Sequence, residues 1–338
     1  MITTAGLFDL QVNGFAGVDF NDAGLTPEAF ETAIDALLAS GVTQFLPTLI
    51  TATEAQLQAR FAALDRAVQA SPRARAMVPG YHLEGPFLNP APGFCGCHPS
   101  GAMVPADIGM VDRLRAPLSK PIMLLTLAPE QPHALEVIEA ARARTIAVSL
   151  GHSDARAATV KQAIAQGARM ATHLGNGVAH QMHKFDNPIV AQLVEDALWG
   201  CFIVDGIHVP KAVLTMLLRT KGLERSILVT DAVSAAGAKA GRYPFAGFWV
   251  DRGEDGTVRE KDAPNLAGSS LTMDQGVRNL VDWGLCHFAD AIRLGSDNPR
   301  QALAEQGLVV QDPGQVRWSD NHRVIETVLN GEVVFKRS

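Results

Sequence analysis

Four side chains that can bind a metal or carry a proton each stand at the end of an apolar run of the chain. They are Glu84, His152, His173 and Asp231. If the apolar runs are strands of a parallel barrel, their carboxyl ends meet on one rim and bring these side chains together. Two imidazoles and a carboxylate bind a first-row divalent ion and leave a position for water, whose proton a neighbouring aspartate can move. The pattern therefore predicts a hydrolytic metal site.

The ligand types also indicate which metal to expect. Zinc suits two His and one Glu best, although iron(II), cobalt(II) or manganese(II) accept similar ligands. Glu84 lies among apolar neighbours, where an unpaired carboxylate is costly to bury. A metal is one partner that would offset this cost, and a buried salt bridge is the alternative.

The composition narrows the class of protein. The chain has 338 residues, of which 47% are hydrophobic and 19% charged, as expected of a globular protein with many buried strands. The net charge of −6 argues against a nucleic-acid-binding surface. No apolar run reaches the ~18 residues of a membrane span, and no basic stretch with an apolar signal core opens the chain. We therefore expect neither nucleic acid nor a membrane as a partner.

The cysteines indicate a reducing compartment. There are four, and Cys95 and Cys97 are too close together to bridge comfortably. No second pair of cysteines completes a zinc site with them. We expect reduced thiols and a cytoplasmic location.

Apolar strand candidates alternate with amphipathic helix candidates along most of the chain, which is the pattern of βα units. The predicted strands are residues 6–12, 42–49, 77–83, 121–127, 145–150, 168–172, 201–204 and 226–230. The predicted helices are residues 27–39, 54–70, 107–115, 132–144, 155–166, 188–197, 210–221 and 271–283. Eight of each favour an α/β fold that closes into a (β/α)8 TIM-type barrel over an open sheet.

Two stretches depart from the barrel pattern. Between the eighth strand and the eighth helix, frequent glycines interrupt short runs such as residues 243–250, which predicts hairpins or an active-site loop. In the tail, short β-prone pieces flank Asn330 and Gly331, a strong hairpin signal. We expect a barrel domain over residues 1–300 and a small, reduced β appendage packed on it over residues 301–338.

Seven segments together resemble N-acetylglucosamine-6-phosphate deacetylases, a family of the amidohydrolase superfamily. They occur in the family's order and are residues 9–14, 82–87, 151–153, 172–176, 205–208, 228–232 and 266–273. The tail is similar to the family's closing β segment. The resemblance implies a metal-dependent hydrolysis of the N-acetyl amide of an amino sugar 6-phosphate, which yields acetate and the free amine.

The resemblance also implies roles for individual residues. Glu84, His152 and His173 would be the metal ligands, and Asp231 would be the general base and acid. The residues expected to contact the substrate are Gln11, Asn13, His98, Asn176, Gly177, Lys184 and His208.

Some of these positions leave alternatives open. His208 would meet the sugar or the scissile carbonyl, and Asn176 either a substrate oxygen or a helix N-terminus that it caps. Many superfamily members bind a second metal with His-x-His where this chain has Gln11 and Asn13. Because neutral amides are poor zinc ligands, we expect one metal ion.

The chain departs from the family pattern at three places. The loop over residues 89–98 is longer and lacks the usual Lys, with His98 as the counterpart of the family's His. An Arg that reaches the substrate phosphate in the family, often from a neighbouring subunit, is absent, and Lys184 is the nearest cation; His180 and His183 beside it are equally compatible with a solvated loop. A β segment that precedes the first barrel strand in the family is missing, so the small sheet is expected from the tail alone.

These departures keep other functions open. The enzyme could act on an unphosphorylated N-acyl sugar or another small amide, because a Lys offers no bidentate grip on phosphate. A non-catalytic barrel scaffold is a third hypothesis, although such relatives usually lose the ligands or the aspartate. The resemblance further implies a homodimer with the active site near the subunit contact.

Overall fold

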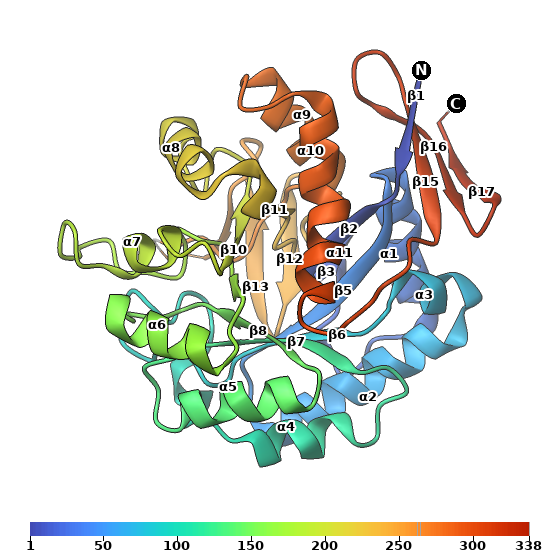
Figure 1. Ribbon diagram of the computed structural model, residues 1–338. Helices are drawn as coiled ribbons and strands as arrows, with labels where there is room; N and C mark the ends of the chain where they lie inside the picture. The colour runs from blue at the N-terminus through green and yellow to red at the C-terminus, as the bar shows by residue number, and fades with distance from the viewer. Residues whose placement is uncertain (262, 264, 338) are drawn as a thin grey trace.

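The structure is a computed structural model that describes residues 1–261, 263 and 265–337. Eight parallel strands form one sheet in the order β11-β10-β9-β8-β7-β6-β5-β2, surrounded by helices (Figure 1). These strands are β2 (Leu7–Val12), β5 (Val42–Ile50), β6 (Tyr81–Glu84), β7 (Ile122–Leu127), β8 (Ala147–Leu150), β9 (Met170–Ala171), β10 (Trp199–Ile203) and β11 (Ser226–Val229). The predicted (β/α)8 barrel is confirmed.

The helices predicted between the strands are all present. They are α1 (Pro27–Ala39), α2 (Glu54–Ala70), α4 (Ile108–Arg115), α5 (Ala134–Ala143), α6 (Ala157–Gln166), α7 (Pro188–Leu193), α8 (Lys211–Lys221) and α9 (Met273–Asp282). Helix α1 begins where the Thr26 side chain accepts a hydrogen bond from the backbone of Ala29. Helix α2 begins with a capping box between Thr53 and Gln56, which satisfies two otherwise unpaired N–H groups.

The structure also differs from the sequence prediction in local elements. Three further α-helices are α3 (Pro72–Met77), α10 (Phe288–Gly295) and α11 (Asp297–Ala304). The sequence predicts Met77 as the start of the third strand, but Ser71 caps α3, so that Met77 ends a helix and the strand begins at Tyr81. The short β-prone piece at residues 309–310 has no strand structure.

A buried carboxylate helps to close the barrel between its first and last strands. One oxygen of Asp9 on β2 accepts a hydrogen bond from the backbone N–H of Thr230, 3.2 Å away, and the other accepts one from the Thr230 hydroxyl. Just beyond, the Asn13 N–H donates to the Ala232 carbonyl at 2.7 Å. Burial raises the pKa of Asp9 to about 7, because the charged form loses its hydration. The seam is therefore held by backbone hydrogen bonds at Ala232 together with the Asp9 side chain.

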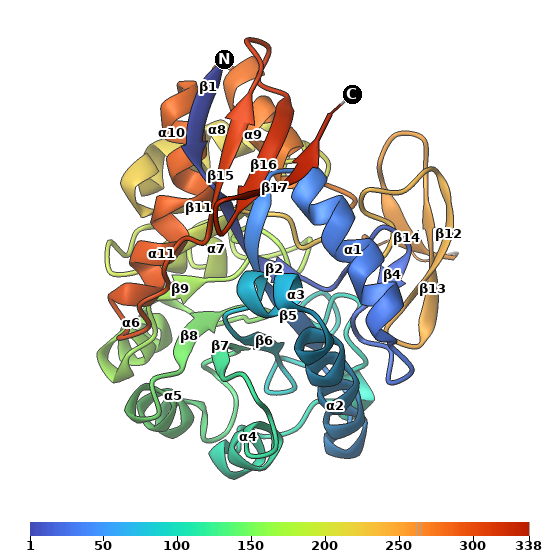
Figure 2. The same cartoon turned by 90° about the vertical axis from the view of Figure 1, so that its right-hand side faces the viewer.

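A three-stranded sheet interrupts the barrel between β11 and α9. It consists of β12 (Gly241–Phe245), β13 (Phe248–Arg252) and β14 (Val258–Glu260), which confirms the predicted hairpin. Figure 2 shows it standing beside α1 and β4 (Val18–Asp19), which pairs with β3 (Gly14–Phe15). Its inner face packs on the barrel mouth through Phe245, Val250 and Val258, which meet Ile50 and Val233. Packing of these apolar side chains therefore holds the insert over the carboxyl ends of the barrel strands.

The tail forms a second small sheet with the order β1-β15-β16-β17. Its strands are β1 (Ile2–Ala5), β15 (Gly314–Trp318), β16 (Val324–Leu329) and β17 (Glu332–Lys336). Asn330 and Gly331 both have positive φ, as the predicted two-residue hairpin turn requires. The sequence predicts this sheet from the tail alone, and the structure adds β1 from the N-terminus. The division into residues 1–300 and 301–338 stays a prediction.

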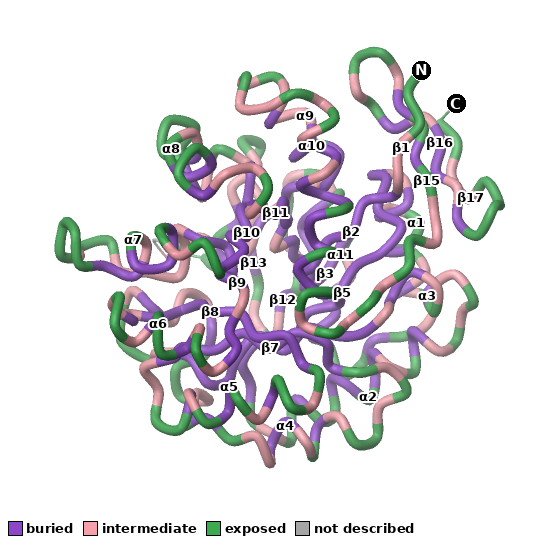
Figure 3. Tube along the Cα trace, viewed as in Figure 1, coloured by how far each residue is buried: buried purple, intermediate pink, exposed green. Residues whose placement is uncertain are grey.

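The buried residues follow the strands and the inward faces of the helices (Figure 3). All positions of β2, β5 and β7 are buried, in agreement with their nearly continuous apolar sequences. Within the described part of the chain, no helix is long and apolar enough to cross a bilayer. The four cysteines are free thiols.

The raised pKa of Asp9 predicts a pH-dependent stability. Because the folded protein holds this proton more tightly than the unfolded chain, the contribution is complete below the ordinary value of 3.8 and is lost as the pH rises through about 7. We expect Asp9→Asn to flatten the decline of the unfolding free energy between these pH values. Urea unfolding of both proteins across this range measures the effect. The exposed Asp282→Asn is the control, and an equal slope in wild type and Asp9→Asn would contradict the prediction.

Candidate active site

The four residues that the sequence indicates lie at the carboxyl ends of four barrel strands, β6, β8, β9 and β11. Glu84 is the last residue of β6, and His152, His173 and Asp231 each lie two residues beyond a strand. The latter three have positive φ angles of 52°, 32° and 51°. Side chains other than glycine rarely adopt this backbone, and such strain persists where the surrounding structure imposes it. The strand ends thus turn sharply and direct the three side chains inward.

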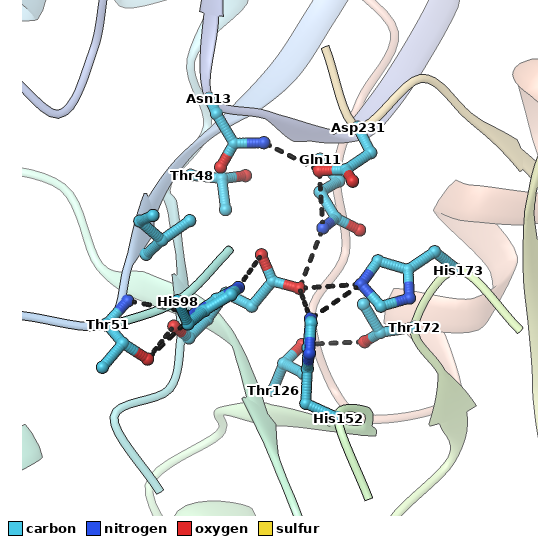
Figure 4. A network of polar contacts seen from close by, with 12 residues as sticks. Gln11, Asn13, Thr48, Thr51, His98, Thr126, His152, Thr172, His173 and Asp231 are labelled. Carbon is cyan, nitrogen blue, oxygen red and sulfur yellow. Dashed lines mark hydrogen bonds and ion pairs between the residues drawn. The ribbon is translucent and has the colours of Figure 1, made fainter. Parts of the chain in front are cut away.

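Glu84, His152 and His173 converge on one point, and Figure 4 shows the rings of His152 and His173 turned toward each other. The Glu84 Oε1 atom lies 3.1 Å from His173 Nε2 and 3.5 Å from His152 Nε2. The two Nε2 atoms are 3.2 Å apart. Ligands at ~2.0–2.2 Å from a tetrahedral ion are separated from one another by roughly 3.3–3.5 Å. The three atoms therefore fit a divalent ion placed between them.

The hydrogen bonds of the ring nitrogens agree with this arrangement. The Nδ1 atom of His152 lies 2.7 Å from the carbonyl oxygen of Phe94, so Nδ1 donates and Nε2 keeps its lone pair for a metal. Among the described residues, His173 Nδ1 has no hydrogen-bond partner. Gly177 lies against His152, where a Cβ atom would be 2.9 Å from Nδ1. The ring is therefore held by a carbonyl on one side and a glycine on the other.

His98 offers a second possible ligand set. Glu84, His98 and His152 present ligand atoms within 4.8 Å of one another, and His98 Nε2 is 3.8 Å from Glu84 Oε2. We favour the set with His173, because its atoms lie closer together and meet at one carboxylate oxygen. His98 is held at Nδ1 by the Thr51 hydroxyl, 2.9 Å away. Burial and the adjacent His152 lower the pKa of His98 to about 3, so the ring is neutral.

Asp231 is held beside this cluster by two amides from β2 and the residue that follows it. Gln11 Nε2 and Asn13 Nδ2 lie 3.0 and 2.8 Å from Asp231 Oδ1. The same Gln11 nitrogen is 3.0 Å from Glu84 Oε1, so it links the two carboxylates. Burial, followed by the negative charge of Glu84, raises the pKa of Asp231 to about 6. Although burial opposes it, imidazole hydrogen bonds hold the pKa of Glu84 well below its ordinary value.

A layer of buried hydroxyl groups lies directly beneath the cluster. Thr126 Oγ1 is 2.8 Å from both Thr172 Oγ1 and His82 Nε2. Burial lowers the pKa of His82 to about 4, which leaves this ring neutral. Since Thr172 precedes His173, the network fixes the strand end that carries a candidate ligand.

The cluster opens into a cavity of about 490 Å³ at the barrel mouth. The predicted substrate residues Asn13, His98, Asn176, Gly177 and His208 line it. Gln11 lies beneath them, against Asp231 and Glu84.

Lys184 is the predicted substrate residue that the structure does not bring to this cavity. Its Nζ atom lies 5.2 Å from the ring centroid of Phe185, a side chain that is 71% exposed. By contrast, Cys97, Arg259 and Asn265 line the cavity although the sequence reasoning assigned them no role. Arg259 and Asn265 belong to the glycine-punctuated insert, which carries no periodic signal that could have placed them.

The alternative ligand sets predict different effects of two matched substitutions. We expect His173→Ala to lower the affinity for a divalent ion by more than the roughly 10- to 100-fold typical of residues behind the ligands. His98→Ala should retain wild-type metal content, because its ring lies farther from the shared carboxylate oxygen. Metal analysis and titration of both purified variants provide the measurement. The reverse result would favour Glu84, His98 and His152 as the ligands.

Comparisons with known proteins agree with this geometry. No family model matches the chain. It is 31% identical to N-acetylglucosamine-6-phosphate deacetylase of Bacillus subtilis, over 98% of this chain and 84% of that protein. The Bos taurus enzyme of the same name is 34% identical, over 99% and 84%. N-acetylgalactosamine-6-phosphate deacetylase of Escherichia coli O157:H7 is 33% identical, over 89% and 78%.

Solved structures give the same result. N-acetyl-D-glucosamine-6-phosphate deacetylase of Mycobacterium smegmatis, determined as a variant in complex with N-acetyl-D-glucosamine-6-phosphate, superposes with a TM-score of 0.88. It is 28% identical, and the match covers 99% of this chain and 87% of that one. A 5-methylcytosine deaminase of Klebsiella pneumoniae, at 11% identity and a TM-score of 0.53, shares the fold alone. This chain belongs to the N-acetylglucosamine-6-phosphate deacetylase family of the amidohydrolase superfamily.

Proposed function

We propose that this protein hydrolyses the N-acetyl amide of an amino sugar 6-phosphate to acetate and the free amine. The observation that carries the proposal is the convergence of Glu84, His152 and His173 on one point, with Asp231 linked to Glu84 through Gln11. Relatives named as deacetylases of N-acetylglucosamine 6-phosphate and of N-acetylgalactosamine 6-phosphate support it. Because both sugars occur among the relatives, both configurations of the sugar are candidate substrates.

Glu84, His152 and His173 would hold one divalent ion, and we propose Zn²⁺, with Fe²⁺, Co²⁺ or Mn²⁺ as alternatives. When bound, such an ion lowers the pKa of a water ligand and polarises a carbonyl oxygen. Glu84 supplies a carboxylate whose pKa is held low, and binding of the ion would displace the proton that the raised pKa of His173 beside Glu84 favours on its ring.

The position beside β2 supports one ion rather than two. Gln11 and Asn13 direct their amide nitrogens at carboxylate oxygens and thus act as hydrogen-bond donors there. An N–H group that donates to Asp231 offers no lone pair to a cation. These amides also hold Asp231 in place without adding positive charge, which would lower its affinity for a proton.

We assign proton transfer to Asp231. Because Gln11 and Asn13 both occupy Oδ1, the other oxygen, Oδ2, is the one assigned to accept the proton of the attacking water. The same oxygen would then return the proton to the nitrogen of the leaving amine. The raised pKa of this buried aspartate suits a group that must accept and release a proton.

Two histidines are placed to orient the substrate. His208 is fixed by Asp205, whose Oδ2 atom lies 2.6 Å from its Nδ1, and it lines the cavity. His98 lines the cavity and is fixed by Thr51. We assign both to the sugar or the scissile carbonyl. Asn176 donates one amide N–H to the His173 carbonyl at 3.0 Å, which leaves its oxygen and its second N–H for a substrate.

A second candidate keeps the chemistry and changes the substrate to an unphosphorylated N-acyl sugar. The observation that favours it is the place of Lys184, the cation that the sequence offers for the phosphate, outside the cavity. A non-catalytic scaffold is disfavoured because the three ligands and the aspartate are all retained. We also propose a homodimer, from the family resemblance, and a cytoplasmic location, from the cysteine usage.

Asp231→Asn tests the proton carrier. The amide cannot accept the proton, so we expect turnover to fall by about 100- to 10,000-fold. Metal content should stay at the wild-type level, since Asp231 is outside the proposed ligand set. Steady-state kinetics with metal analysis measure both, and near-normal turnover in the variant would remove Asp231 from this role.

A panel of substrates tests the reaction itself. We expect release of acetate from N-acetylglucosamine 6-phosphate or N-acetylgalactosamine 6-phosphate by the metal-loaded protein, and loss of this activity on metal removal. Unphosphorylated N-acetylglucosamine in the same assay separates the two candidate functions. Equal rates on the phosphorylated and unphosphorylated sugars would favour the second candidate, and no acetate release from any sugar would contradict both.

A further inference from the structure

We propose that Arg259 binds the anionic group of the substrate, from the same subunit that carries the metal ligands. This inference rests on the proposed function, because it names the residue that would hold the phosphate of an amino sugar 6-phosphate. It would replace a cation that the resemblance expects from elsewhere in the chain or from a neighbouring subunit.

The charges in the cavity call for a cation away from the metal site. Glu84 and Asp231 place two carboxylates in the lining of the cavity. Among the described residues that line this cavity, Arg259 is the only Lys or Arg. A phosphate that enters the cavity therefore meets one permanently charged side chain of opposite sign in its lining.

The alternative cation is Lys184. Its Nζ atom stacks over the exposed ring of Phe185, and it is not part of the cavity lining. The segment before it does reach the cavity, through His180 and Met182. The chain therefore leaves the cavity before Lys184. Among the described residues, the permanent cation of the cavity lining comes from the three-stranded insert that carries Arg259.

The backbone around Arg259 fixes the position of its side chain. Arg259 is the middle residue of β14, which pairs with β13 so that Arg259 lies opposite Asp251. The preceding Val258 is buried in the apolar cluster beneath the insert. Because successive side chains of a strand point to opposite faces, Arg259 is directed away from this cluster. Arg259 is exposed, shares its face of the sheet with Asp251 and lines the cavity.

A short segment of the chain connects Arg259 with the part of the site that contains Asp231. Arg259 forms an antiparallel bridge with Leu266, which also lines the cavity. Three residues further on, the backbone N–H of Ser269 donates to the carbonyl oxygen of Asp231 at 2.9 Å. Leu266 and Gly268 both line the cavity between these two points, so Arg259 and Asp231 lie at different places along its wall, as required for groups that contact different ends of a sugar.

The chemistry of the side chain suits a phosphate. A guanidinium donates two parallel N–H groups to two phosphate oxygens, whereas an ammonium acts as a point charge. Removal of one charge-assisted hydrogen bond from a binding site costs about 10- to 100-fold in affinity. The effect should appear mainly in KM, because the phosphate lies away from the reacting carbonyl and is bound equally in the ground and transition states.

Arg259→Gln tests the proposal on the metal-loaded protein. We expect kcat/KM for the phosphorylated N-acetyl sugar to fall by about 10- to 100-fold, through KM, with little change for the unphosphorylated sugar. Arg259→Lys should recover part of the loss. Arg242→Gln is the matched control, since Arg242 lies on the same sheet and pairs with Asp251 at its exposed surface. Lys184→Gln tests the alternative cation.

Calorimetric binding of glucose 6-phosphate, which carries the anion but no acetyl group, gives a readout that does not depend on hydrolysis. Weaker binding by Arg259→Gln than by wild type and Arg242→Gln supports the proposal. Equal binding by all three overturns it, as does a loss found only in Lys184→Gln. If wild type binds glucose 6-phosphate through Arg259 but releases no acetate from any N-acetyl sugar, the proposed function fails while this assignment stands.

Discussion

The buried carboxylate of Glu84 is the constraint on which the site depends. It is 2% exposed, and its negative charge is compensated by two imidazole rings and by the amide of Gln11. A carboxylate in such surroundings would otherwise take up a proton or destabilise the fold. The sequence leaves a metal or a salt bridge as its partner. The structure offers no Lys or Arg among the described contacts of Glu84, so a cation shared with the two rings fits best.

The sequence was sufficient for the parts of the fold that carry strong local signals. Helices α1 and α2 have the predicted bounds, because Thr26 and Thr53 supply unambiguous caps. The strands were recognisable because burial on both faces produces continuous apolar runs. The sequence does not predict helices α10 and α11, although α10 buries Ala291 and Ile292, because Gly295 at the end of α10 and Pro299 in the first turn of α11 divide the pattern into two short pieces.

The candidate site likewise contains residues that the sequence predicts and residues that it does not. The four residues at strand ends could be found because a barrel places all such ends on one rim. The sequence does not predict that Lys184 lies outside the cavity or that Arg259 lines it. Both residues belong to irregular or inserted segments whose path depends on tertiary packing. The insert reaches the cavity through apolar contacts of Val258 and Phe245 that have no counterpart in a barrel pattern.

The seam between the first and last barrel strands also holds Asp231 next to Gln11, the amide that donates a hydrogen bond to it. Gln11 lies on β2, whereas Asp231 follows β11, and between these strands the Asp9 carboxylate takes the place of part of the backbone ladder. Regions with few ladder bonds open more readily than the rest of a protein. A local opening at this seam would separate Asp231 from the side-chain amide of Gln11 while the other strands stay paired. Heating would then inactivate the enzyme at a lower temperature than the one at which the barrel unfolds.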